Sequence, residues 1–322
     1  MHAIQINEIG GPEVLEWAEV SSPMPGPGEV VVRLAAAGLN YVDTYFRRGL
    51  YPRDVPFVPG MEGSGTVELM GAGVEGWRVG DRVAWTDVEA SYAERVAVPV
   101  ERAVRVPDSV GTETAAAAML QGITAHYLAT DTFPLGPGHR CLIHAGAGGV
   151  GQLLIQIAKL LGAEVVATAG GDEKVALAAN AGADHVIDYT KVDFVEAMEA
   201  LVGKRAIDVV YDGVGAATFE GGLNVLRRRG LMVTFGNASG PVPPISPLQL
   251  SQRGSLFLTR PTMKDYISTR VELESRVSDL FEWIQEDRLQ VRVGARFALA
   301  EAADAHRALE SRATTGKVLL VP

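Results

Sequence analysis

The sequence predicts an α/β protein with two parts, one built on a parallel sheet and the other rich in short strands. Between residues 123 and 262, six short apolar segments alternate with helical segments, which is the pattern of a six-stranded parallel sheet. The first third of the chain instead contains short strand candidates separated by glycine and proline turns. A last strand candidate at 317–321 follows a long helix candidate, and we expect it to return to the β-rich part.

The strand candidates of the β-rich part are apolar or alternating runs that end in turn residues. Residues 30–34 follow a turn cluster of proline and glycine at 23–28. Similar runs occupy residues 65–70, 81–85 and 92–98. Together they predict a barrel-like β domain.

The middle part of the chain supplies the strands of the parallel sheet. Its six strand candidates are residues 141–144, 164–169, 185–187, 207–211, 230–235 and 255–259. A long amphipathic helix is expected at 270–286, and its apolar side is formed by Val271, Val277, Leu280, Phe281 and Ile284. The expected domains are therefore 123–262, and 1–122 together with 263–322.

A glycine-rich turn follows the first strand candidate of the parallel sheet. Gly146, Gly148 and Gly151 have the spacing G-x-G-x-x-G and precede an apolar helical segment. Such glycines permit a tight turn, bring backbone N–H groups close to a pyrophosphate and let the helix pack on the strand. Because a strand and a helix flank the motif, a dinucleotide site is favoured over the glycine turn of another doubly wound protein, such as a methyltransferase.

The end of the second strand candidate favours NADPH over NADH. An NAD site has an acidic residue there, whereas this sequence has Ala169, Gly170 and Gly171, which leave room for a 2′-phosphate. Lys174 supplies a cation and Tyr189 a hydroxyl group for that phosphate. The alternative for Lys174 is an ordinary solvated residue in the first turn of the next helix. We predict NADPH as the cofactor.

The composition excludes several classes of protein. Of the 322 residues, 47% are hydrophobic and 21% charged, and the net charge of −10 disfavours broad binding to a nucleic-acid backbone. The single cysteine excludes an intrachain disulfide. There is no apolar run long enough to span a membrane and no signal-peptide pattern. We expect a cytoplasmic protein with neither a nucleic-acid partner nor a membrane segment.

A polar cluster stands at helical spacing in the β-rich part. Asn40, Asp43, Tyr45 and Tyr51 could form the wall of a substrate cleft that faces a nicotinamide. In the alternative interpretation Asn40 caps a helix, Asp43 pairs with Arg47 at i,i+4, and the tyrosines only pack. The residues alone leave both interpretations open.

Motifs along the whole chain resemble those of a known superfamily. The motifs are Gly10-Gly11-Pro12-Glu13-Val14-Leu15, Asp43-Thr44-Tyr45, Gly49-Leu50-Tyr51-Pro52, Gly60-Met61-Glu62, Ala147-Gly148-Gly149-Val150-Gly151, Arg228-Arg229-Gly230-Leu231-Met232-Val233, Phe235-Gly236-Asn237 and Glu310-Ser311-Arg312-Ala313-Thr314. They resemble the medium-chain dehydrogenase/reductase superfamily, and in particular its zinc-independent quinone oxidoreductase, or zeta-crystallin-like, branch. The resemblance implies a Rossmann-type nucleotide domain and a discontinuous GroES-like β-barrel catalytic domain.

The resemblance also implies roles for individual residues. It places Asn40, Asp43, Tyr45 and Tyr51 in the nicotinamide and quinone pocket. The residues that it assigns to the cofactor, together with the Gly170 position described above, are Thr124, Gly148, Gly149, Val150, Lys174, Tyr189, Phe235, Gly236, Asn237 and Arg312. Some relatives have lysine at the position of Gln121 and tyrosine at the position of His126, so the charge near the substrate differs here.

A zinc site is not expected. Zinc-dependent members of the superfamily have Gly-His-Glu where this chain has Gly60-Met61-Glu62, and a catalytic zinc needs three protein ligands. The only cysteine, Cys141, lies in the strand before the glycine turn, and the six histidines show no paired ligand spacing.

The resulting functional expectation is NADPH-dependent reduction of a quinone without a metal. Hydride transfer and one-electron transfer both remain open. The alternatives are an NADPH-dependent enone or enoyl reductase and a non-catalytic, crystallin-like or RNA-associated NADPH-binding protein. The resemblance further implies a homodimer, formed through the sheet edge at 230–235 and 255–259.

Overall fold

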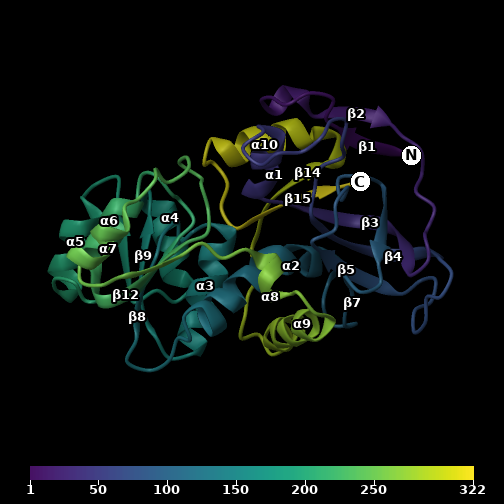
Figure 1. Ribbon diagram of the computed structural model, residues 1–322. Coiled ribbons are helices and arrows are strands. Elements are labelled where there is room, and N and C mark those ends of the chain that lie inside the picture. The colour runs from purple at the N-terminus through teal and green to yellow at the C-terminus, as the bar shows by residue number, and fades with distance from the viewer. The chain divides into compact units, whose positions relative to one another are not determined.

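The computed structural model describes all residues from 1 to 322, and the chain forms two compact units (Figure 1). Unit 1 consists of Met1–Ile123 and Ile267–Pro322, and unit 2 consists of Thr124–Tyr266. The first boundary falls within helix α2 (Thr112–Tyr127). Each unit has its own sheet.

The sheet of unit 2 has six strands, all parallel, which confirms the expected doubly wound architecture. Its strands are β8 (Arg140–Ile143), β9 (Glu164–Ala169), β10 (His185–Asp188), β11 (Ile207–Asp212), β12 (Leu226–Thr234) and β13 (Phe257–Thr259). Their order is β10-β9-β8-β11-β12-β13, so the direction of winding reverses between β8 and β11. Ligands of doubly wound proteins bind beyond the carboxyl ends of the strands at such a reversal.

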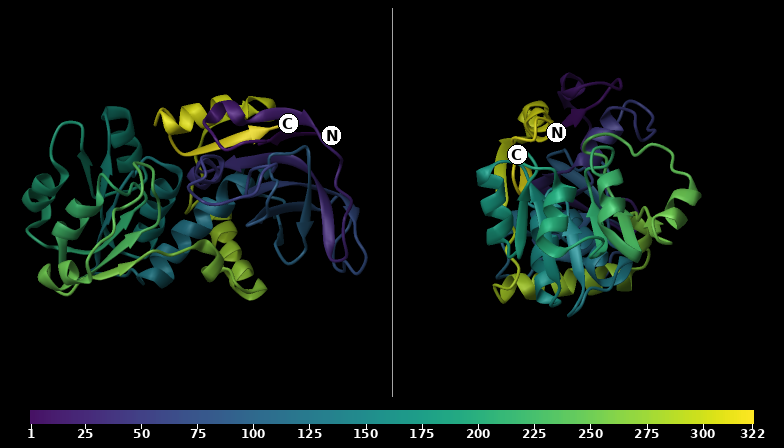
Figure 2. Two further views of the ribbon diagram at one scale, coloured as in Figure 1. Left: turned by 45° about the horizontal axis from the view of Figure 1, so that its top comes forward. Right: turned by 90° about the vertical axis from the view of Figure 1, so that its left-hand side faces the viewer.

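Helices cover both faces of this sheet (Figure 2). They are α3 (Gly149–Leu160), α4 (Asp172–Asn180), α5 (Phe194–Val202), α6 (Phe219–Val225) and α7 (Pro247–Gln252), with the short α8 (Met263–Tyr266) at the end of the unit and a π-helical turn at Leu128–Thr132 before β8. Helix α3 contacts α4, and α5 contacts α6, as right-handed crossovers on opposite faces require. Because both faces are covered, the strands are apolar over most of their length.

Unit 1 is built around one long strand. Strand β3 (Glu29–Leu39) pairs with β4 (Glu62–Met70), β6 (Arg95–Pro99) and β15 (Lys317–Val321). The remaining strands of the sheet are β5 (Arg82–Thr86), β7 (Ala103–Arg105) and β14 (Val293–Ala298), and β1 (His2–Gln5) pairs separately with β2 (Glu16–Glu19). Val318 of β15 lies opposite Leu39 of β3, so the last strand returns to the N-terminal part as expected.

Four α-helices, α2 among them, pack on the sheet of unit 1 or connect its strands, together with short 3-10 turns. Besides α2 they are α1 (Tyr41–Arg47), α9 (Arg270–Gln285) and α10 (Ala302–Glu310), and the 3-10 turns span Pro12–Val14 and Leu299–Glu301. In α9 the buried side follows Leu273, Val277 and Leu280. The placement of Val271 on that side was wrong, because its side chain is 75% exposed.

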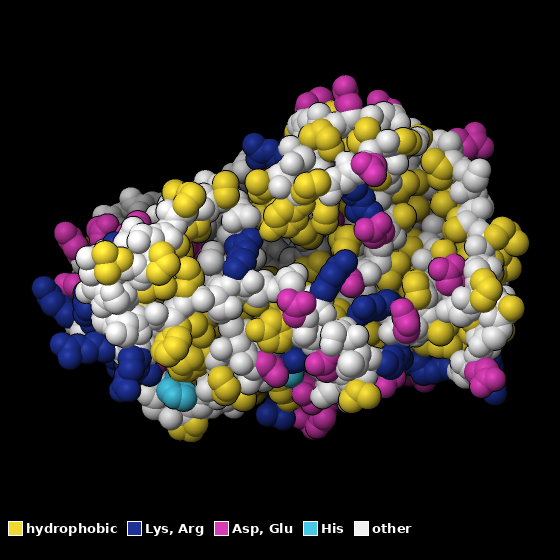
Figure 3. Space-filling view, viewed as in Figure 1, with side chains coloured by type: hydrophobic (Ala, Val, Ile, Leu, Met, Phe, Trp, Pro, Cys, Tyr) yellow, Lys and Arg dark blue, Asp and Glu magenta, His cyan; other side chains and the backbone are white.

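The surface carries both signs of charge despite the acidic composition. Lys and Arg side chains gather at the left end of the face in Figure 3, over the outer part of unit 2. Lys204, Arg205, Arg228 and Arg229 are exposed residues of that unit.

No helix is both long enough and apolar enough to cross a membrane.

Candidate functional site

The turn between β8 and α3 requires glycine at two positions. A Cβ atom at Gly151 would lie 2.3 Å from the Ala145 carbonyl oxygen, and a Cβ atom at Gly146 would lie 2.9 Å from that of Ala167. Ala145 itself adopts φ 54°, a left-handed conformation that is unfavourable for alanine. The chain therefore passes through a strained, closely packed turn before the helix begins.

The same turn presents backbone donors at the start of α3. The helix begins at Gly149, so the N–H groups of Gly149, Val150 and Gly151 have no acceptor within the helix. The first intrahelical bond is donated by Gln152 N to Gly148 O at 3.0 Å, and the Gln152 side chain donates to Ala147 O at 2.7 Å. These free donors and the helix dipole suit a pyrophosphate, and Gln152, which sequence reasoning missed, supports the turn.

The ends of β9 and β10 meet where a 2′-phosphate was predicted. The Tyr189 ring lies against the backbone of Gly170, since a Cβ atom there would be 2.7 Å from the Tyr189 hydroxyl oxygen. Lys174 is the third residue of α4, the first-turn position that the structural alternative assumed. Gly170 and Tyr189 therefore come together, and the functional role of Lys174 stays a prediction.

An ion pair that the sequence did not reveal lies beside these residues. Asp172, the first residue of α4, forms an ion pair with Lys191, which also lies 3.3 Å from Asp188. These pairings raise the pKa of Lys191, so its ammonium stays charged and offsets both carboxylates beside the end of β9. Lys191 thus partly neutralises Asp172, an acidic residue that would otherwise repel the 2′-phosphate.

The loop after β12 packs tightly against the loop after β11. Phe235 N donates to Asp212 O at 2.8 Å, and a Cβ atom at Gly236 would lie 2.2 Å from Gly213 O. Arg260 donates to Gly236 O at 3.1 Å. Most of the unit 2 residues predicted to bind the cofactor thus lie at or beyond the carboxyl ends of strands in one sheet, whereas Thr124 is a buried residue of α2.

Asn40 lies at the start of α1 in a buried polar network. Its side-chain amide donates to Glu62 Oε1 at 2.7 Å, and its oxygen accepts from Lys317 Nζ at 2.8 Å and from Gln121 Nε2 at 3.2 Å. Glu62 also pairs directly with Lys317, and its second oxygen accepts from Leu120 N at 2.6 Å. Every polar atom of the Asn40 side chain is therefore oriented by the fold.

Glu62 and Lys317 complete the buried network around Asn40, and sequence reasoning assigned neither of them to the site. A Cβ atom at Gly38 would lie 2.2 Å from Glu62 Oε1, so glycine on β3 makes space for the ion pair. The motif Gly60-Met61-Glu62 marked one partner. Nothing local marked Lys317, which is 255 positions away.

Asp43 is buried in the first turn of α1. Its Oδ2 accepts from Asn40 N at 2.9 Å and from the Tyr92 hydroxyl at 3.0 Å, whereas its Oδ1 is buried without a partner. Burial raises the pKa of Asp43 to about 7. The alternative in which Asp43 pairs with Arg47 is wrong, because Asp43 turns back to the N-terminus of the helix and Arg47 pairs with Glu310.

The two tyrosines of the expected pocket contact each other. The rings of Tyr45 and Tyr51 meet edge to face with centroids 5.4 Å apart, and Tyr51 has a similar contact with Phe46. Tyr45 is only 8% exposed. Packing accounts for this arrangement of the rings, and a hydroxyl role toward the substrate stays a prediction.

Arg312 follows the end of α10 in unit 1, whereas Lys174 and Tyr189 belong to unit 2. Arg312 is exposed and has φ 60°. A left-handed residue other than glycine costs roughly 1 kcal/mol of backbone strain. Contact of all three residues with one phosphate stays a prediction.

The residues present do not fit a zinc site. No group of three His, Cys, Asp or Glu side chains is placed to hold a metal ion. Met61 has no donor suited to replace histidine as a zinc ligand, Glu62 is already paired with Lys317, and Cys141 is buried in β8.

Comparison with known proteins places this geometry in a family. The model described as "Alcohol dehydrogenase GroES-like domain" matches residues 26–132, which confirms that part of the expected fold, and the model "Zinc-binding dehydrogenase" matches 149–286. A quinone oxidoreductase of Pseudomonas aeruginosa is 44% identical over 99% of both chains.

Two further relatives cover nearly the whole chain. The crystal structure of Escherichia coli quinone oxidoreductase complexed with NADPH is 40% identical, with a TM-score of 0.98 over 100% of both chains. A 2-haloacrylate reductase from Burkholderia sp. is 38% identical over 99% of this chain and 98% of its own length. The chain therefore belongs to the quinone oxidoreductases of the medium-chain dehydrogenase/reductase superfamily.

Proposed function

We propose that this protein is an NADPH-dependent quinone oxidoreductase that acts without a metal. The observation that carries the proposal is the glycine turn after β8, whose free N–H groups suit a pyrophosphate, combined with the small residues at the end of β9. Membership of the family supports the quinone as acceptor.

The residues of each unit have separate tasks in this proposal. In unit 2, Gly148, Gly149 and Val150 would bind the pyrophosphate, and Lys174 and Tyr189 the 2′-phosphate. In unit 1, Arg312 would add a second cation. NADPH supplies the reducing equivalents when bound, and the protein binds and orients it.

The tyrosines would assist on the acceptor side. As an acceptor oxygen gains negative charge, a hydroxyl from Tyr45 or Tyr51 can donate a hydrogen bond to it. Asn40 is held by Glu62 and Lys317 in a single orientation, so its neighbourhood needs no rearrangement during the reaction.

Rapid-mixing kinetics with NADPH and NADH against a panel of quinones tests the proposal. We expect oxidation of NADPH by quinones, a marked preference over NADH, and a lower turnover of Tyr51→Phe with unchanged NADPH affinity. Binding of NADPH without oxidation by any quinone would instead indicate the non-catalytic alternative.

A second candidate reaction is reduction of an activated alkene. The observation in its favour is the relative named 2-haloacrylate reductase. A tyrosine donor would matter more there, because the reduced alkene must gain a proton. Comparing 9,10-phenanthrenequinone with 2-chloroacrylate and a crotonyl thioester under NADPH separates the two reactions.

We also propose that the protein is a homodimer joined through β13. This strand is the last in its sheet. Phe257 on β13 is 59% exposed, and Leu248 on the preceding helix α7 is 62% exposed. An apolar edge strand pairs readily with a second copy. Sedimentation equilibrium should give a dimer for the unmodified protein and a monomer for Phe257→Asp.

A further inference from the structure

Helix α10 ends in a cap that contains an arginine where glycine is usual. Arg312 N donates to Leu309 O at 3.1 Å and Ala313 N donates to Ala308 O at 3.3 Å, which is the Schellman pattern of hydrogen bonds. The left-handed residue of this pattern is Arg312, with φ 60°. Retaining a long side chain at a position that favours glycine points to a use for that side chain.

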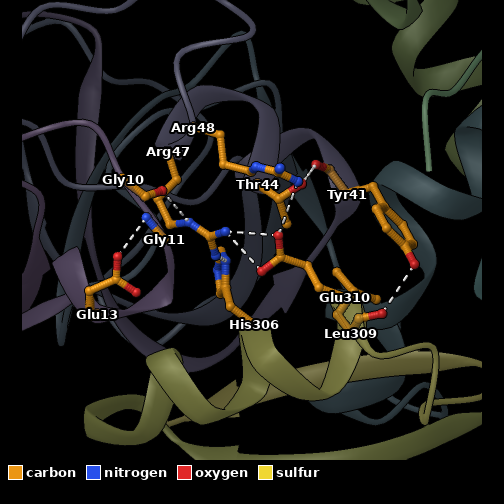
Figure 4. A network of polar contacts seen from close by, with 10 residues as sticks. All are labelled: Gly10, Gly11, Glu13, Tyr41, Thr44, Arg47, Arg48, His306, Leu309 and Glu310. Atoms are coloured by element: carbon orange, nitrogen blue, oxygen red, sulfur yellow. Dashed lines mark hydrogen bonds and ion pairs between the residues drawn. The ribbon is translucent and has the colours of Figure 1, made fainter. Parts of the chain in front are cut away.

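Helix α1 and the residue that follows it hold the last turn of α10 through three side chains (Figure 4). The Tyr41 hydroxyl donates to Leu309 O at 3.1 Å, the same carbonyl that accepts from Arg312 N. Arg47 donates to both carboxylate oxygens of Glu310 at 2.9 and 2.8 Å, and Arg48 lies 3.6 Å from the same carboxylate. The two residues before the cap are thus held from outside the helix.

Arg47 is in turn held in place by other buried groups. Its side chain is 1% exposed, and it also contacts His306 Nδ1 at 2.8 Å and donates to Gly10 O at 3.2 Å. Burial lowers the pKa of His306 to about 3, so a neutral imidazole accepts from the guanidinium. These contacts orient the Arg47 guanidinium toward Glu310, and Figure 4 shows the two hydrogen bonds that it donates to that carboxylate.

We propose that Tyr41 and Glu310 are positioning residues that fix the cap of α10 and thereby direct Arg312 to the 2′-phosphate of NADPH. This inference rests on the proposed function, because it takes the phosphate contact of Arg312 from there. It adds that selectivity for NADPH depends on residues of α1 and α10 that need not touch the cofactor.

The sign of the expected effect separates positioning from simple electrostatics. Glu310 carries a negative charge two residues from Arg312, so removing that charge would by itself strengthen the binding of a phosphate. If Glu310 acts by positioning, its removal instead weakens NADPH binding. NADH, which lacks the 2′-phosphate, should bind with nearly the same affinity in both cases.

Calorimetric titration with NADPH and NADH tests the proposal without turnover. We expect Glu310→Gln to weaken NADPH binding about five-fold and Tyr41→Phe about two-fold, with the NADH affinity unchanged. In an Arg312→Ala background neither substitution should have a further effect. Asp304→Asn is the matched control, because this exposed residue of the same helix pairs only with Arg307, and it should leave both affinities unchanged.

The possible failures are distinguishable. If Arg312→Ala lowers NADPH affinity but Glu310→Gln does not, or if Glu310→Gln affects both cofactors equally, the positioning role is overturned and the proposed function stands. If Arg312→Ala does not change the ratio of NADPH to NADH affinity, its phosphate contact is wrong and the positioning role fails with it. Absence of NADPH binding by the unmodified protein overturns the proposed function itself.

Discussion

The Lys317 ammonium donates a hydrogen bond to the Glu62 carboxylate inside unit 1, where the two side chains are 1% and 0% exposed. Asn40 bridges the pair, since it donates to Glu62 and accepts from Lys317. The pair joins the beginning of β4 to the beginning of β15, and Asn40 connects both to the start of α1. An ion pair thus orients a residue of the expected substrate pocket.

Removing one member of this pair should destabilise the protein strongly. Lys317→Met leaves the Glu62 charge buried without its partner, which typically costs about 3–5 kcal/mol of the free energy of unfolding. Lys317→Met combined with Glu62→Gln should recover part of the loss. Urea unfolding measures both changes.

The control for this experiment is Lys159→Met, whose partner Asp184 lies at the surface with 36% of its side chain exposed. This substitution should cost less than about 1 kcal/mol. Equal losses of unfolding free energy for Lys159→Met and Lys317→Met would show that burial does not increase the contribution of the Glu62–Lys317 pair to stability.

Asp43 should make stability depend on pH. Its pKa in the folded protein is raised from 3.8 to about 7, so the folded state holds a proton that the unfolded state has released between these values. The stability associated with Asp43 is therefore fully present below about pH 4 and is lost as the pH rises through 7.

Asp43→Asn keeps an acceptor for Asn40 N and Tyr92 and does not titrate. Between pH 5 and pH 8, the unmodified protein should lose roughly 2 kcal/mol relative to this variant. Urea unfolding at the two pH values measures the difference. A constant difference across this range would mean that Asp43 is ionised throughout.

The glycine turn should tolerate no side chain at Gly151. In Gly151→Ala the new Cβ atom would meet the Ala145 carbonyl oxygen, so the turn must move and its N–H groups lose their alignment. We expect NADPH binding at least about ten-fold weaker by calorimetry. Gly136→Ala is the control, because its Cβ atom would have no neighbour closer than 4.0 Å, and it should bind NADPH normally.

Lys191 should favour NADPH through its pairing with Asp172. Lys191→Met leaves the Asp172 carboxylate uncompensated beside the end of β9, so NADPH binding should weaken roughly two- to five-fold while NADH binding stays constant. The effect should shrink at high salt and become smaller in an Asp172→Asn background, in which Asp188 is the remaining partner of Lys191. A loss of the same size in that background would mean that Lys191 does not act through Asp172.

Local patterns predicted most of the framework. The six strands of unit 2 follow apolar runs, and Gly146, Gly148 and Gly151 identified the turn because their spacing reflects contacts within one strand–turn–helix unit. The wrong placement of Val271 came from the same kind of local pattern. Helical spacing groups the residues that share one side of a helix, but it does not show how far along that side the core extends.

The amino-acid sequence by itself determined the order of the elements, the glycine turn and the small residues at the end of β9, because these depend on neighbours along the chain. Only the tertiary structure decided which charged groups share a buried site. Lys317 and Glu62 are 255 positions apart, and Arg47 and Glu310 are 263 apart. The packing of distant strands and helices brings such partners together. A charge that this packing buries away from water needs an opposite charge beside it, and the sequence does not show which residue will supply it.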